Sequence, residues 1–87
     1  MTYNNTRYGN LPVGGVKVLS GNELQLPATL TLTSAAGGRA IELSNDGVNF
    51  FTPTYDATTA NMISVSVKSP IKVYRITGLV GEQYSAL

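Results

Sequence analysis

Cysteine, histidine and tryptophan are all absent from this chain of 87 residues. Without cysteine the protein has neither a disulfide framework nor a thiolate metal site. Without histidine it lacks the commonest metal ligand and the commonest general base. We therefore expect no metal and no cofactor, and an enzyme would need paired carboxylates, an activated lysine, or a serine with another base.

The acidic residues do not form a recognisable catalytic pattern. They are Glu23, Glu42, Asp46, Asp56 and Glu82. Two carboxylates could meet across a sheet, as in a glycosidase, but their spacing gives no sign of it. Asp46 lies in the stretch "NDG", which lacks the run of oxygen ligands of a calcium loop and is typical of a turn. We expect a protein that is not an enzyme and has no catalytic residues.

Charge is also scarce, since only 13% of the residues are charged and the formal net charge is +1. The basic residues are spread along the chain, which is a poor footprint for nucleic acid. The N-terminus lacks the apolar run of a signal peptide, and no segment approaches the length of a membrane span. We expect a soluble protein, made in a cytoplasm, that binds neither nucleic acid nor a membrane.

Hydrophobic residues alternate with polar ones in run after run, which predicts half-buried β-strands. The runs are "VKVLS", "ELQLP", "TLTLT", "RAIELS", "MISVSV" and "IKVYRIT", with a last short run, "EQYSA", expected at a sheet edge. No window shows a helical period. The expected core is Val16, Val18, Leu24, Leu26, Leu30, Leu32, Ile41, Leu43, Ile63, Val65, Val67, Val73 and Ile76. These patterns predict an all-β protein, either a small antiparallel β-sandwich of the jelly-roll type or a barrel.

Asn45 to Gly47 carry the residues of a tight hairpin turn, so "VNFFT" is expected to run back beside "AIELS". Alternation along a strand then forces the rings of Phe50 and Phe51 to opposite faces. A hairpin loop of two or three residues would put Phe50 in the core and leave Phe51 to meet a partner subunit or the folded-back arm. Arg75 should either lie near a strand end or meet a carboxylate, because a core arginine is costly unless it is paired.

The first dozen residues have no hydrophobic period and are rich in Asn, Tyr and Gly. We expect residues 1–12 to form an extended N-terminal arm that orders against something else, ahead of a single domain over residues 13–87. Aromatic side chains are enriched where proteins meet. The predicted interface residues are Tyr3, Tyr8, Phe51 and Tyr55.

Two stretches, "LSNDGVNF" and "VYRITG", resemble elements of discoidin-like, galactose-binding-like jelly rolls. In those domains a Ser-x-Asp-Gly hairpin is followed by an aromatic residue and later by a strand with an aromatic, an arginine and an aliphatic residue. The resemblance spans residues 41–78.

Over its full length the pattern is similar to that of small bacteriophage virion proteins, of the capsid decoration, cement or connector kind. These are compact β domains with a polar N-terminal arm. The resemblance implies a structural part of a phage particle that binds viral capsid or tail subunits in many copies or as a homo-oligomer. It also implies a place in the virion after synthesis in the host cytoplasm. The alternative, from a different class, is a small carbohydrate-binding module with Tyr55 and Phe51 as stacking platforms for sugar rings.

Overall fold

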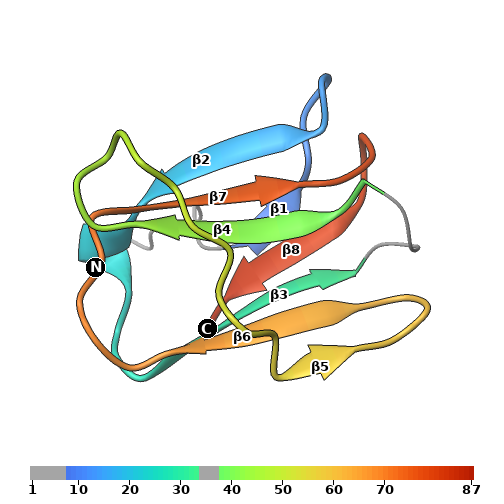
Figure 1. Ribbon diagram of the computed structural model, residues 1–87. Coiled ribbons are helices and arrows are strands. Elements are labelled where there is room, and N and C mark those ends of the chain that lie inside the picture. Colours follow the sequence, from blue (N-terminus) through green and yellow to red (C-terminus); the bar gives the residue numbers. More distant parts are fainter. Residues whose placement is uncertain (1–7, 34–37) are drawn as a thin grey trace, which may run out of the picture.

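The structure is a computed structural model that describes residues 8–33 and 38–87. The described residues form two antiparallel sheets, one of five strands in the order β1-β8-β3-β6-β5 and one of three strands in the order β2-β7-β4 (Figure 1). The strands are β1 (Tyr8–Asn10), β2 (Val16–Ser20), β3 (Ala28–Thr33), β4 (Ala40–Ser44), β5 (Ala57–Thr58), β6 (Ile63–Val67), β7 (Val73–Thr77) and β8 (Gln83–Ala86). The predicted all-β class is confirmed, and of the two architectures left open the chain adopts the sandwich.

The core fills the space between the two sheets. Alternate residues of β3 and β6 point inward from the five-stranded sheet, as the burial of Leu30, Leu32 and Val65 shows. From the three-stranded sheet, β4 and β7 place Ile41 opposite Ile76 and Leu43 opposite Tyr74. All of these side chains are buried, so alternation correctly predicted the inward face of β3, β4 and β6.

The prediction for β2 is wrong. Val16 and Val18 are exposed, and Leu19 is buried instead. The cause lies in the register, since Leu19 sits opposite the buried Tyr74 of β7, while Val18 sits opposite Arg75 on the outer face. A strand with apolar residues on both faces does not itself specify which face meets the core.

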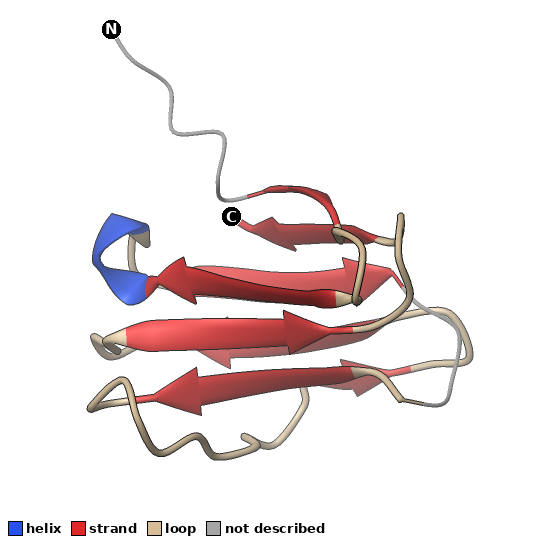
Figure 2. Ribbon diagram, turned by 90° about the horizontal axis from the view of Figure 1, so that it is seen from above, coloured by secondary structure: helices blue, strands red, loops and turns tan. Residues whose placement is uncertain are grey.

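The stretch "ELQLP" does not form the predicted strand. Residues Gly21–Glu23 form a short 3-10 helix, η2, whose N-terminus is capped by Ser20 accepting a hydrogen bond from the N–H of Asn22. Figure 2 shows this helix at one end of the sandwich. After it the chain crosses to β3, leaving Leu24 half-buried and Leu26 exposed rather than in the core. The turn-forming residues Ser20, Gly21 and Asn22 therefore determine the local structure here, and the apolar alternation that follows them does not produce a strand.

The C-terminal strand β8 lies inside the five-stranded sheet, between β1 and β3, and not at the expected edge. Its outer neighbour is β1, where Tyr8 pairs with Ser85 and Asn10 with Gln83. Leu11 then enters the core at 2% exposure. Residues 8–11 thus belong to the folded domain, which moves the expected boundary at residue 12 back toward the N-terminus. The rest of the expected arm, residues 1–7, lies outside the described residues.

The turn after β4 is longer than a two- or three-residue hairpin. Leu43 and Phe51 exchange both backbone hydrogen bonds, at 2.9 Å each, in a single bridge with no strand around Phe51. This register puts Phe51, rather than Phe50, on the same face of the sheet as Leu43. Phe50 lies on the outer face of the three-stranded sheet, with the guanidinium carbon of Arg75 4.0 Å from its ring centroid. The prediction that Phe50 enters the core is wrong, although the two rings do separate as alternation requires.

Candidate functional site

The sequence-predicted interface residues lie on separate surfaces. Tyr8, on β1, is half exposed on the five-stranded sheet, while Phe51 and Tyr55 lie beside β4 of the other sheet. Tyr3 lies outside the described residues. The structure therefore brings Phe51 and Tyr55 to the same strand and leaves Tyr8 on the other sheet.

Phe51 and Tyr55 both form hydrogen bonds to the edge of β4 that faces away from β7. Phe51 pairs with Leu43, and the hydroxyl of Tyr55 accepts a hydrogen bond of 3.1 Å from the N–H of Ile41. The Tyr55 ring is half-buried against the core, whereas Phe51 keeps 45% of its surface exposed. These contacts satisfy backbone groups that would otherwise form an open strand edge.

The opposite edge of the same sheet is open. The N–H of Gly78 donates to the carbonyl of Gly15 and that of Gly21 to the carbonyl of Lys72. Hydrogen-bonded pairs alternate along an antiparallel ladder, so the backbone groups of Val16, Val18 and Ser20 point away from β7. No strand of the described residues pairs with β2 on that side.

Two loops next to this edge present aliphatic side chains to solvent. The loop of residues 11–15 is tied to that of residues 78–82 by hydrogen bonds between Leu11 and Glu82 at 2.8 Å and between Gly81 and Leu11 at 2.9 Å. Gly15, at a φ of +72°, approaches Gly78 so closely that a Cβ would overlap the carbonyl oxygen. Within these loops Val13 is 93% exposed, and Leu79 and Val80 are each 63% exposed. We name Val13, Val16, Val18, Leu79 and Val80 the aliphatic edge.

Arg75 and Glu42 are paired on the outer face of the three-stranded sheet. Arg75 forms an ion pair of 3.0 Å with Glu42 and stacks on Phe50. Of the two alternatives predicted for Arg75, a strand end or a carboxylate partner, the structure shows the carboxylate. Asp46 accepts hydrogen bonds from Asn49, Val48 and Ser44, and those from Asn49 do most to lower the pKa of its carboxyl far below the usual range.

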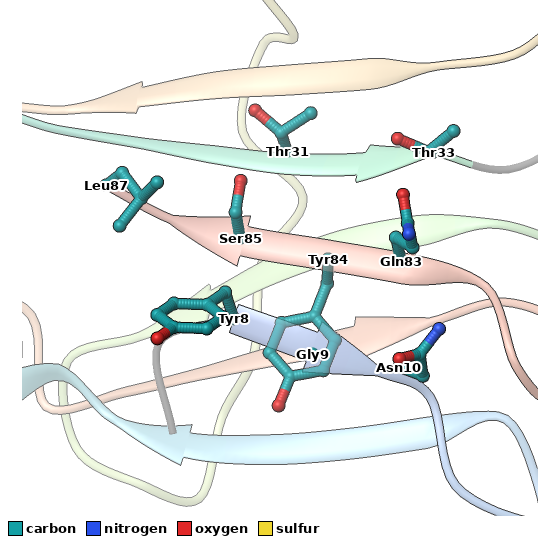
Figure 3. Close-up of a pocket in the computed structure, with 9 residues that line it drawn as sticks. All are labelled: Tyr8, Gly9, Asn10, Thr31, Thr33, Gln83, Tyr84, Ser85 and Leu87. Carbon is teal, nitrogen blue, oxygen red and sulfur yellow. The ribbon is translucent and has the colours of Figure 1, made fainter. Parts of the chain in front are cut away.

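The outer face of the five-stranded sheet has a different character. It carries an open hollow of about 510 Å³, lined by β1, β8, β3 and the C-terminal residue. Figure 3 shows the side chains of Thr31, Thr33, Gln83 and Ser85 projecting in one direction, while the ring of Tyr84 points the other way. None of the described lining residues has a charged side chain. The composition "TLTLT" indicates a polar strand face, but only the sheet order places β8 and β1 beside it.

Within the described part of the chain, no three His, Cys, Asp or Glu residues gather closely enough to hold a metal ion. The described segments also contain no helix that is long and apolar enough to span a membrane. Comparisons of the chain with protein-family models, curated proteins and solved structures find no match.

Proposed function

We propose that this protein is a non-enzymatic structural component of a phage particle, which binds capsid or tail subunits in multiple copies. The observation that carries the proposal is the aliphatic edge, where an unpaired strand lies beside exposed apolar loop residues. Exposed apolar groups that gather on one side of a small domain are typical of a contact with another protein.

The open β2 edge supports a partner that adds backbone hydrogen bonds. The backbone N–H and carbonyl groups of Val16, Val18 and Ser20 point away from β7 and are unpaired in the described structure. Edge strands in monomeric proteins are usually short, covered or heavily charged, and Lys17 is the one charged residue of β2. The other edge of the sheet, at β4, is covered by Phe51 and Tyr55. The contrast favours β2 as the side that meets a neighbouring subunit.

Tyr8 and Phe51 support contacts in more than one direction. Tyr8 is 51% exposed on one sheet and Phe51 is 45% exposed beside the other. A component held in a lattice has neighbours on several sides, and exposed aromatic side chains are frequent anchors in such contacts. The predicted arm, with Tyr3, would add a further contact.

The direct test is electron microscopy of particles from the native source, with the chain located by a tag at its C-terminus. We expect it at the capsid or the tail in many copies. Val18→Lys should reduce incorporation, because it places a charge on the aliphatic edge at a residue that is 54% exposed and outside the core. Val48→Lys is the matched control, since Val48 is 78% exposed in a loop away from that edge. Absence of the chain from purified particles, or equal incorporation of both variants, would contradict the proposal.

A further inference from the structure

The hollow on the five-stranded sheet is built from two rows of neutral polar side chains. Tyr8, Ser85 and Thr31 form one row across β1, β8 and β3, because Tyr8 and Thr31 each pair with Ser85. Asn10, Gln83 and Thr33 form the next row in the same way. The two rows are two residues apart along each strand, which is roughly 7 Å, so one small ligand can contact both rows.

Most of these side chains are not used by the fold. Asn10 donates to the carbonyl of Gly81 at 2.8 Å, and that bond holds the rim of the hollow. Within the described residues, the side chains of Thr31, Thr33, Gln83 and Ser85 form no hydrogen bond. On the same sheet, Ser66 instead donates to Asp56. The hollow therefore presents donors and acceptors that remain available to a ligand.

The chemistry of the lining selects a class of ligand. Hydroxyl and carboxamide groups both donate and accept, as the hydroxyl groups of a sugar do. Because the described lining has no charged side chain, it gives a phosphate, a carboxylate or an ammonium group no side-chain ion-pair partner. Tyr8 and Leu87 add exposed apolar surface at the side of the polar rows, suited to the C–H face of a pyranose ring. The volume of about 510 Å³ lies within the range of small-molecule sites.

We propose that this hollow binds a neutral saccharide, with Thr31, Gln83 and Ser85 as hydrogen-bonding residues and Tyr8 as the stacking residue. This site differs from the pair of platforms predicted from the sequence, since the Tyr55 ring is half-buried and its hydroxyl is engaged with β4. The proposal does not rest on membership of a phage particle.

The test is an NMR titration of the isotopically labelled full chain with neutral trisaccharides of glucose, galactose and N-acetylglucosamine. Sialylated and sulfated sugars are titrated alongside them. We expect at least one neutral sugar to shift the amide signals of β3 and β8 around the hollow. Thr31→Val removes one hydroxyl at nearly constant volume and should weaken binding about fivefold, as expected for one hydrogen bond.

Thr29→Val is the matched control, because Thr29 lies on the same strand and face two residues away but does not line the hollow. It should bind as the natural chain does, and both variants should keep the same unfolding temperature. Four outcomes overturn the proposal: no response to any neutral sugar, a response to charged sugars alone, equal loss in the two valine variants, or shifts confined to Phe51 and Tyr55.

Discussion

At the scale of single residues, Phe50 and Phe51 show how a side-chain environment depends on loop length. Alternation separates the two rings but does not say which one shares a face of the sheet with Leu43. The bridge between Leu43 and Phe51 leaves seven residues between them, 44 to 50, and this count places Phe50 on the outer face above Arg75. A ring stacked on a guanidinium contributes much less to stability than a ring buried in a core.

Phe50→Ala should therefore lower the free energy of unfolding by only about 1–2 kcal/mol, from a partly exposed cation–π contact and a modest loss of burial. A double-mutant cycle with Arg75→Met should show a coupling of roughly 0.5–1 kcal/mol. Urea unfolding of the four proteins measures both quantities. A loss above ~3 kcal/mol for Phe50→Ala, with no coupling to Arg75, would indicate a core position instead.

Asp46 organises the turn after β4 through the hydrogen bonds that its carboxylate accepts. Since these bonds lower its pKa in the folded state below the unfolded value of about 3.9, the charged carboxylate stabilises the fold above that pH. The contribution is lost as pH falls below ~4 toward the folded pKa. Asp46→Asn should lower the unfolding temperature at neutral pH, and the gap to the natural protein should narrow below pH ~4. Thermal unfolding monitored by circular dichroism from neutral to acid pH measures it, and a constant gap would contradict the assignment.

At the scale of the element, β2 has apolar residues on both faces, and its pairing with β7 decides which of them is buried. Leu19 is 6% exposed and Val18 is 54% exposed. Leu19→Ala should cost about 2–5 kcal/mol of unfolding free energy, whereas Val18→Ala should stay within ~0.5 kcal/mol. Chemical denaturation of both variants provides the comparison. Similar losses for the two would mean that β2 presents the other face to the core.

At the scale of the whole molecule, β1 is where the N-terminal segment joins the folded domain. Deleting residues 1–7 should change the unfolding free energy by less than ~1 kcal/mol, since the core residues of the described structure are all retained. Deleting residues 1–12 also removes β1 and the buried Leu11, and should cost roughly 2–5 kcal/mol or more. Denaturant unfolding of the two truncated chains measures the difference. If the shorter chain were as stable as the longer one, β1 would be dispensable and residues 8–12 would belong to the arm.

The sequence by itself determined the class of fold and most of the core. The alternating runs "TLTLT", "IELS" and "ISVSV" have apolar residues on one face only, so the burial of those residues follows from the period of a strand. Arg75 had to find a carboxylate or a strand end because an unpaired guanidinium is costly to bury, and Glu42 meets it across β4 and β7.

The tertiary structure decided whatever depends on which segments become neighbours. The buried face of β2, the interior place of β8 and the inclusion of Tyr8–Asn10 in a sheet all follow from pairings between residues far apart in the sequence. The hollow has the same origin, because its rows join residues 8–10, 31–33 and 83–85. A local pattern encodes the period of one strand, but it does not encode the partner, the register or the edge, which are set by how all the strands pack together.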